Sequence, residues 1–449
     1  MRGRYLIETW LRGLEHRFQS RRAGRHREDA DIGSVRQLVP YFETVLRDNI
    51  IDFWLPRCLD REHGGYLVDF DSDGQYLDQD RKGLVAQSRM LWFLSSLIAS
   101  GFETPSNPRA DLIAAAANGY EFLRGKLYDS VHGGFYWEVN RSGSQVVREH
   151  KDGYGQAFAL FALSQYAIST GDVSARELAS ELFHVIDERL HDGQHRGYVE
   201  FAGRSWGPAP AEAVRYTGPY RQTDKTTNTH LHLLEALTPY HRLAPSPLSR
   251  ERLLELIQIQ TRTVMRDGSA SSYDSFEPNW RPSDIERNLL VSYGHDLENI
   301  HLVIDACAAA DTPSSLYFDN FQRIVQHAFD NGFDWRGGGF FLYGKPGKPA
   351  HRREKLWWVQ AEALLGLLHA HEHFQQPRAL EVFLRTWRFV DRELIDHRNG
   401  EWFDRVRPDG SVVRQKGHEW KAAYHNGRAM LRCIEILRAS ETPSANLLA

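Results

Sequence analysis

The chain has 449 residues, of which 41% are hydrophobic and 25% are charged, and its formal net charge is −4. This length suits two or three ordinary domains or one large ring-shaped fold, and the composition is typical of a soluble globular protein. Without a basic surplus to neutralise phosphates, we expect no general nucleic-acid binding. The three cysteines are widely separated and form no disulfide framework or paired-cysteine metal motif. We therefore expect a reducing, cytoplasmic location.

Residues 1–34 form a predicted arginine-rich extension. Residues 1–27 contain eight arginines against two glutamates, and one helical stripe carries Ile7, Trp10, Leu11, Leu14 and Phe18. The segment lacks the apolar core of a secretory signal, and no run in the chain approaches the ~18 apolar residues of a membrane span. We expect a helix docked on the protein's own body or a partly disordered leader. A helix that binds a membrane surface or a partner is the alternative.

A glycine followed by an aromatic residue recurs along the chain, with steps of roughly 60 to 75 residues between successive units. The instances are EHGGY (62–66), VHGGF (131–135), HRGY (195–198), RGGGFF (336–341) and NGEWF (399–403). Residues 268–290 are equally rich in turn-forming residues but contain no clean match. The steps are too long for the common solenoid repeats. Each unit is predicted to consist of a helix, a short β-hairpin or loop, and a second helix.

The second helices are predicted to begin near residues 84, 150, 227, 294, 355 and 418, and they are richer in Ala, Leu and Trp than the first helices. This contrast favours an inner ring of helices packed against an outer ring. We therefore predict an all-α (α/α)6 barrel of six helix pairs over residues 35–440, with short β-hairpins at one mouth and a tail at 441–449. An open helical solenoid and two separate helical domains are the alternatives, although no linker rich in Pro, Gly or Ser divides the chain.

Polar side chains recur near the start of each predicted inner helix. Asn228, His232 and Glu235 are spaced i, i+4 and i+7, which places them on one helical face. The other polar and aromatic candidates in these positions are Arg89, Lys151, Tyr154, Gln156, His295, Glu298, Lys355, Trp358, Glu362, Trp420, Lys421, His425 and Arg428. Since all inner helices of a barrel begin at the same mouth, we expect these groups to converge there, where helix N-termini also favour an oxyanion. Within this set, Lys151, Gln156 and Lys421 are expected to be structural.

A structural role is the ordinary alternative for each of these residues. A helical histidine is more often a core or surface residue than a catalyst, and charged residues near a helix start often cap it. Recurrence at one position in several units weakens this alternative. His230 and His232 are two residues apart and cannot face one metal from a regular helix. No HExxH motif, Cys/His cluster, phosphate loop or nucleophile elbow is present, so we expect neither a metal nor another cofactor.

Histidines backed by carboxylates and an arginine suit proton abstraction next to a carbonyl. Imidazole acts as base or acid near neutral pH, Glu298 or Glu235 would orient an imidazole, and an arginine can stabilise an enediolate. Glycoside hydrolysis instead needs two carboxylates across a scissile bond. The acidic residues of these helices leave hydrolysis open, but it would give the histidines no role. Non-catalytic sugar binding is a further alternative.

Four segments resemble the N-acylglucosamine 2-epimerase superfamily: NTHLHLLEA (228–236), SYGHDLE (292–298), WWVQAEAL (357–364) and EWKAAYHNGRA (419–429). The SYGHD and YHNGR forms are most similar to its cellobiose 2-epimerase and mannose 2-epimerase branch. The similarity extends from residue 35 to residue 437. It implies an (α/α)6 barrel that interconverts sugars at C2, or isomerises aldoses and ketoses, through a metal-free cis-enediolate.

By this resemblance His295 and His425 correspond to the general acid/base pair, and His232 to a third histidine that assists them. The implied substrate-binding residues are Arg89, Tyr154, Asn228, Glu235, Glu298, Trp358, Glu362, Trp420 and Arg428. The implied substrate is the reducing end of a free sugar, either a cellobiose-type β-1,4-disaccharide or mannose and glucose, and we expect a monomer or a homodimer. One departure is His301, which stands where the family usually carries Trp. The segment 203–226 is expected to overhang the cavity mouth, with an ordinary packing loop as the alternative.

Overall fold

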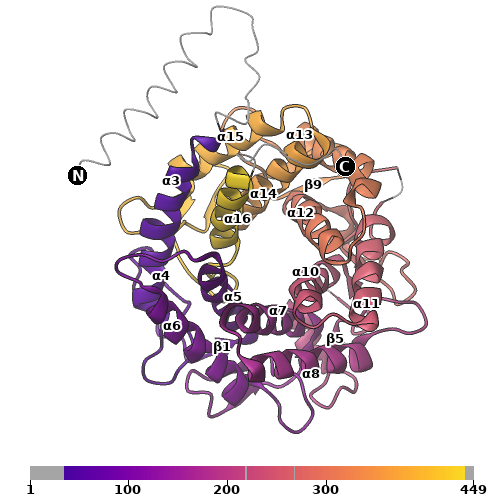
Figure 1. Ribbon diagram of the computed structural model, residues 1–449. Coiled ribbons are helices and arrows are strands. Elements are labelled where there is room, and N and C mark those ends of the chain that lie inside the picture. Colours follow the sequence, from indigo (N-terminus) through magenta and orange to yellow (C-terminus); the bar gives the residue numbers. More distant parts are fainter. Residues whose placement is uncertain (1–34, 218–219, 267, 440–449) are drawn as a thin grey trace, which may run out of the picture.

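The structure is a computed structural model that describes residues 35–217, 220–266 and 268–439. The predictions for the arginine-rich extension and for the C-terminal tail lie outside these residues. Helices of the described part form two concentric rings (Figure 1). The inner ring consists of α5 (Leu84–Ser100), α7 (Gly153–Thr170), α10 (Thr227–Leu243), α12 (Tyr293–Ala309), α14 (Trp357–Phe374) and α16 (His425–Ala439).

The outer ring surrounds these helices, and several of its members end in a wider π-helical turn. Its members are α3 (Val39–Thr44) with η1 (Val45–Ile51) and α4 (Asp52–Cys58), α6 (Arg109–Phe122) with η2 (Leu123–Leu127), α8 (Val173–Leu190), α11 (Pro247–Gln258) with η3 (Ile259–Thr263), η5 (Ser314–Tyr317) with α13 (Phe318–Asn331), and α15 (Ala379–Phe389) with η6 (Val390–Leu394). Inner helices are buried on nearly all sides, whereas an outer helix such as α13 buries one apolar stripe. None of the described helices is both long and apolar enough to cross a membrane.

The first and last outer segments meet and close the ring. Phe42 of α3 packs edge-to-face on Trp387 of α15, with the ring centroids 4.6 Å apart. Trp54 of α4 donates from its indole nitrogen to Oε2 of Glu401 at 2.6 Å. In addition, α16 contacts both α3 and α5. These contacts agree with the predicted barrel of helix pairs and exclude the open solenoid and the two-domain arrangement.

Short antiparallel strands join neighbouring units at one mouth. A two-residue strand precedes five of the inner helices, namely β1 (Lys82–Gly83), β4 (Lys151–Asp152), β6 (Lys225–Thr226), β8 (Val291–Ser292) and β11 (Lys355–Leu356). Each pairs with a strand of the next unit, respectively β2 (Glu138–Val139), β5 (Phe201–Ala202), β7 (Ser275–Phe276), β9 (Tyr343–Lys345) and β12 (Arg405–Val406). Three of these sheets gain a further strand from β3 (Val146–Arg148), β10 (Lys348–Arg352) and β13 (Val412–Val413).

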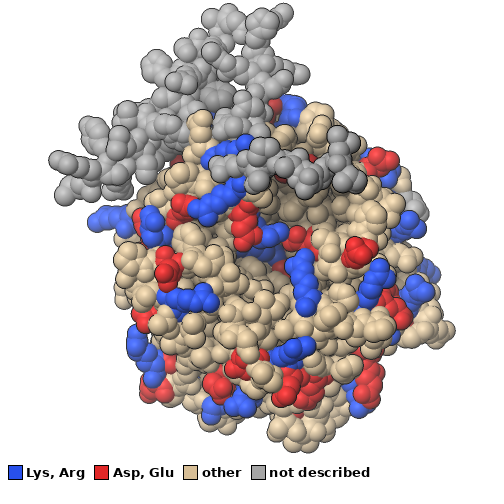
Figure 2. Space-filling view, viewed as in Figure 1, with Lys and Arg blue, Asp and Glu red and all other residues tan. Residues whose placement is uncertain are grey.

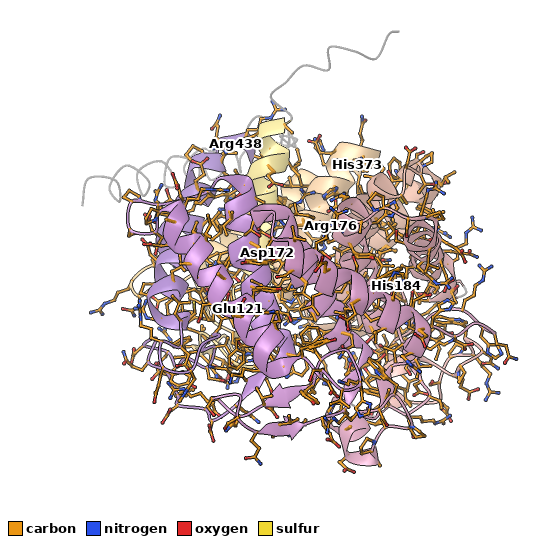
Figure 3. All side chains as sticks on the ribbon, turned by 60° about the horizontal axis from the view of Figure 1, so that its bottom comes forward. Glu121, Asp172, Arg176, His184, His373 and Arg438 are labelled. Atoms are coloured by element: carbon orange, nitrogen blue, oxygen red, sulfur yellow. The ribbon has the colours of Figure 1, made fainter. Side chains whose placement is uncertain are left out.

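This pairing holds the N-termini of the inner helices at one end of the barrel. In Figure 3 the strands lie at the bottom, while Arg438 and His373, near the C-terminal ends of α16 and α14, lie at the top. The mouth with the strands is called the hairpin mouth below, and the opposite one the far mouth. Two short helices within loops, the α-helix α9 (Ala211–Thr217) and the 3-10 helix η4 (Glu286–Leu289), complete the described elements.

In each hairpin, the glycine-aromatic repeat is the part that is held by a side chain of an inner helix. In the second unit, the side-chain amide of Gln156 donates to the carbonyl of Phe135 and accepts from its N–H, both at 2.8 Å. Gly134 has φ +69°, and a Cβ there would lie 2.9 Å from Oε1 of Gln156, so glycine is required. Gln87 and Gln360 make the same pair of bonds in the first and fifth units. The repeat is therefore a packing device.

Buried lysines complete the same anchors. Lys151 pairs with Asp129 at 3.2 Å, and Lys421 pairs with Glu401 at 2.5 Å. The predicted structural roles of Lys151, Gln156 and Lys421 are thus confirmed. Lys355, which was expected near the site, instead pairs with Asp334 at 2.7 Å.

Three inner helices begin later than predicted. α7 begins at Gly153 instead of near 150, α14 at Trp357 instead of near 355, and α16 at His425 instead of near 418. The first two are delayed because the preceding residues pair as strands β4 and β11. Before α16, His418 and Lys421 exchange backbone hydrogen bonds in a turn. Trp420 therefore belongs to this turn and not to the helix.

Candidate active site

Two histidines from different inner helices lie beside one tryptophan at the hairpin mouth. The ring of His295, in the first turn of α12, lies 4.9 Å from the indole of Trp358, and the ring of His425, the first residue of α16, lies 5.8 Å from it. Trp358 is half-buried and belongs to the first turn of α14. A Cβ on Gly294 would lie 2.4 Å from the same indole, so this glycine lets α12 approach it closely. The glycine of the SYGHD motif thus allows the close approach of Trp358, which lies beside both histidines.

His425 is oriented by a buried carboxylate. Its Nδ1 lies 2.6 Å from Oε1 of Glu362, a side chain with no solvent exposure. Burial raises the pKa of Glu362, but Arg428 and two histidines outweigh burial and hold this pKa well below its usual range. An ionised carboxylate only accepts hydrogen bonds, so Nδ1 of His425 carries the proton and Nε2 is left for the mouth. Burial lowers the pKa of His425 to about 3, which favours the neutral imidazole.

His295 differs from His425 in its surroundings. Among the described residues, no carboxylate is hydrogen-bonded to it, and the charge of Glu362 acts on it only from a distance. It is half-buried and borders a small cavity of about 30 Å³ together with Asn228, Arg287 and Ser292. Oδ1 of Asn228 and Oγ of Ser292 lack hydrogen-bond partners there. Burial lowers the pKa of His295, and the positive charge of Arg287 adds to this effect.

His232 forms the opposite side of the site. Its Nδ1 lies 2.9 Å from Oε2 of Glu235, one turn further along α10. Its ring packs on Tyr154 at 5.0 Å and on Phe158 at 4.7 Å, both from α7. Burial lowers the pKa of His232, while the hydrogen bond to Glu235 opposes this shift. His230, two residues earlier, points elsewhere and accepts from the backbone N–H of Tyr198 at 2.8 Å.

Arg89 of α5 joins this side to the turn before α16. One guanidinium nitrogen donates to the carbonyl of Trp420 at 2.7 Å, and another donates to the hydroxyl of Tyr154 at 2.9 Å. The guanidinium also lies over the ring of Phe158, 4.5 Å from its centroid. Trp420 and Tyr154 are half-buried, and their rings are 6.3 Å apart. An arginine and two aromatic faces are thus fixed beside His232.

A buried ionic cluster lies beneath the histidines. Arg428 of α16 donates to Oε1 of Glu298 at 2.7 Å, lies 2.8 Å from Oε1 of Glu362, and also pairs with Glu235. The hydroxyl of Tyr424 donates to Glu235 at 2.6 Å. All five side chains are buried. The cluster therefore supports the histidines from behind.

Three donors at this place have the residue types of a metal site. Glu298, Glu362 and His425 each offer a ligand atom, and these atoms lie within 4.8 Å of one another. However, Arg428 already contacts both carboxylates, and Glu362 is bonded to the Nδ1 nitrogen of His425. A guanidinium is positively charged at any physiological pH. It therefore supplies the positive charge that a metal would bring to these carboxylates.

Comparison with known proteins identifies the family. A family model described as N-acylglucosamine 2-epimerase (GlcNAc 2-epimerase) matches residues 65–429. The chain belongs to this family. A cellobiose 2-epimerase of Bacteroides fragilis is 30% identical over 396 residues, which cover 87% of this chain and 96% of the relative. The solved structure of cellobiose 2-epimerase from Bacillus thermoamylovorans B4167 has a TM-score of 0.80 at 29% identity and covers 89% of this chain and 99% of its own.

A D-mannose isomerase of Marinomonas mediterranea is more distant. It is 23% identical over 402 residues, which cover 86% of this chain and 94% of the relative. The likeness is therefore stronger to the cellobiose 2-epimerase than to this D-mannose isomerase. The protein is a sugar 2-epimerase of the isomerase class, and its fold is the predicted (α/α)6 barrel.

Within this epimerase, several predicted site residues have partners that the sequence did not indicate. Glu298 or Glu235 was expected to orient an imidazole: Glu235 holds His232, whereas Glu298 contacts Arg428, and His425 is held by Glu362. Glu235, Glu298, Glu362 and Arg428 were expected to bind substrate, and here they are buried and paired with one another. Their contact with the sugar stays a prediction. Tyr424 was missed altogether. Its position next to His425 in the YHNGR motif was a usable signal, because a tyrosine directly before a catalytic candidate lies at the same end of the barrel.

The segment 203–226 mainly packs on the epimerase's own hairpins. Trp206 donates from its indole nitrogen to the carbonyl of His132 at 2.8 Å, and Arg204 pairs with Asp129 at 3.1 Å. Further along, Tyr220 donates to Oδ2 of Asp274 at 3.0 Å. These contacts fit the packing-loop alternative. The expected influence on the choice of sugar stays a prediction.

Proposed function

We propose that this epimerase inverts C2 of the reducing-end aldose of a β-1,4-linked disaccharide such as cellobiose, with mannose and glucose as monosaccharide alternatives. The observation that carries the proposal is the placement of His295 and His425 beside one indole, that of Trp358, at one mouth. An indole face suits the C–H face of a sugar ring. The relatives named above support the disaccharide, because the more similar ones are cellobiose 2-epimerases.

The proposed chemistry is a proton exchange at C2 of the open-chain sugar. One imidazole takes the C2 proton on its Nε2, and the electron pair left on carbon delocalises onto the C1 oxygen as a cis-enediolate. The second histidine, which enters the cycle with a proton on its Nε2, gives that proton to the opposite face of C2, and the carbonyl at C1 re-forms. The proton held by the first imidazole then passes to the second through solvent or sugar hydroxyls, which restores the starting state. No glycosidic bond breaks and no oxidation state changes. Imidazole suits both steps because it accepts and donates protons near neutral pH.

The neighbouring residues would support this exchange. Arg89 would stabilise the developing oxyanion, while Trp420 and Tyr154 would pack on the sugar. Asn228, whose Oδ1 has no partner, would bind a hydroxyl. His232, held by Glu235, would assist as a third proton-transfer group.

Glycoside hydrolysis on this barrel has less support. It requires two carboxylates on opposite sides of a scissile bond. Glu235, Glu298 and Glu362 instead meet at one guanidinium, that of Arg428. They are buried and lie together beneath the site.

The deciding experiment is incubation of the full chain with cellobiose in D2O, followed by NMR of the products. We expect glucosyl-mannose with deuterium at C2. A ketose product would favour the isomerase alternative, release of a monosaccharide would favour hydrolysis, and an unchanged sugar without deuterium would favour binding alone. Incubation with mannose also distinguishes the epimerase from the isomerase, because an epimerase gives glucose and an isomerase gives fructose.

We further propose that the enzyme acts without metal or nucleotide, in the cytoplasm, as a monomer or homodimer. Arg428 supports metal independence because it already balances the carboxylates, so activity should persist in EDTA. The cysteines Cys58, Cys307 and Cys433 are all buried and unpaired, which suits a reducing compartment.

A further inference from the structure

A second cavity enters the barrel from the far mouth and reaches the back of the ionic cluster. Its volume is about 260 Å³, and its walls include Trp92, Phe161 and Leu302. Figure 2 views the barrel from this end and shows positive and negative side chains interspersed over the face. At its inner end the cavity borders Arg428 and His301. It therefore approaches the site from the side opposite to the hairpin mouth.

His301 connects this cavity to the histidine pair. Its Nε2 lies 2.8 Å from Oε2 of Glu362, and Oε1 of the same carboxylate lies 2.6 Å from Nδ1 of His425. Because the ionised carboxylate only accepts, both imidazoles donate an N–H to it. Glu362 thus lies between two ring N–H donors, while Arg428 contacts it from a third direction. His301 itself is 3% exposed, so this hydrogen bond is not replaced by bulk water.

The geometry points to His301 as a positioning residue for the proton exchange: by holding Oε2 of Glu362, it keeps Oε1 on Nδ1 of His425 and Nε2 of His425 toward the sugar. The inference rests on the proposed role of His425. Its physical basis is the cost of a buried carboxylate oxygen that lacks a donor. Without His301, Glu362 would tilt to find another donor and would release the imidazole of His425.

The first test combines two variants of His301. His301→Ala removes the donor, and we expect kcat to fall roughly 10- to 100-fold, as for loss of a hydrogen bond to a charged group, with KM nearly unchanged. His301→Gln keeps an N–H at the end of the side chain and should retain most of kcat. A wild-type kcat in His301→Ala would overturn the inference, and so would an equal loss in both variants.

Chemical rescue gives a sharper readout. Truncation to Ala opens a hole beside the far cavity, so added imidazole should enter there, donate to Glu362 and restore kcat. Rescue should be non-competitive with sugar, because the sugar occupies the hairpin mouth. 1-Methylimidazole has no ring N–H and should not rescue. The matched control is Leu302→Ala, which enlarges the same cavity next to His301 and should not respond to imidazole.

A third readout does not depend on activity. In the protein with 15N-labelled histidine, His301 and His425 should each give a downfield N–H resonance typical of a bond to a carboxylate. His301→Phe should lose one resonance and shift the other, whereas an unchanged second resonance would overturn the inference. If the wild type converts no sugar, the proposed function fails and this measurement still decides the contact. If the wild type is active and His301→Ala is equally active, the inference alone fails.

Discussion

Arg428 donates from Nη2 to Oε1 of Glu298 at 2.7 Å, although the two residues are 130 positions apart in the chain. The same guanidinium also pairs with Glu235 and Glu362. One cation therefore serves carboxylates from three inner helices. Burial raises the pKa of Glu298 well above its usual range, and the negative charge of Glu362 adds to this shift. The cluster thus joins α10, α12, α14 and α16 at the centre of the barrel.

Replacement of Arg428 by Met should destabilise the fold strongly. Breaking a buried ion pair by removing one partner leaves uncompensated charge and costs about 3–5 kcal/mol. The measurement is urea unfolding followed by circular dichroism. The matched control is Arg432→Met, one turn further along α16, whose side chain is 39% exposed and pairs with Asp305. An exposed pair contributes about 1 kcal/mol or less, so an equally small loss in Arg428→Met would contradict the role of the cluster.

Loss of either His295 or His425 should stop turnover and leave the fold intact. We expect His295→Ala and His425→Ala to lower kcat by at least about 10²- to 10⁴-fold, the usual contribution of a general acid or base. Circular dichroism and the unfolding midpoint should stay near those of the wild type. His184→Ala is the control, because His184 is exposed on the outer helix α8, outside the inner ring that carries the site (Figure 3). Near-normal kcat in either site variant would remove the proposed mechanism.

Two buried carboxyl groups should make stability depend on pH. Asp152 caps α7 by accepting from the N–H of Tyr154 at 2.9 Å, and Glu200 accepts from the hydroxyls of Thr226 and Thr229 at 2.8 and 2.6 Å. Burial raises the pKa of Asp152 to about 7. Burial and the charge of Asp152 raise the pKa of Glu200 to about 8. In the unfolded chain both groups titrate near pH 4.

The folded protein therefore binds these protons more tightly than the unfolded chain does. Their contribution to stability is complete below about pH 4 and is lost as pH rises toward 7 and 8. Asp152→Asn stays neutral and is still a good helix cap, so its free energy of unfolding should fall less than that of the wild type between pH 5 and pH 8. Asp172→Asn, which alters the corresponding cap of α8 at a partly exposed position, is the matched control. Parallel pH profiles for wild type and Asp152→Asn would contradict the prediction.

The sequence was sufficient for the helix pairs and for the convergence of the histidines, because both follow from periodic patterns. His232, His295 and His425 all lie within the first two turns of inner helices, so closing the ring brings them to one mouth. The hydrogen-bond partners within the ionic cluster could not be predicted. Glu362 and Glu298 have the same spacing from the start of their helices, but they contact different neighbours. The late start of α16 was missed because a turn stabilised by backbone hydrogen bonds between His418 and Lys421 leaves no helical period. The fourth unit lacks the glycine repeat, so the repeat could not predict how its loop is held. There Arg266 donates to the carbonyls of Asn288 and Leu290.

Gly294→Ala tests whether the position of Trp358 matters for the sugar. The new Cβ would lie 2.4 Å from the indole, so Trp358 must move away from its place beside the two histidines. We expect kcat/KM to fall about 10- to 100-fold, as for small misplacements of a positioning group. This should happen even though Ala has the higher helix propensity, by about 1 kcal/mol. The control is Gly125→Ala in η2, where no atom lies within 4 Å of the new Cβ, so activity should stay normal. Wild-type kcat/KM in Gly294→Ala would show that the sugar does not depend on this indole.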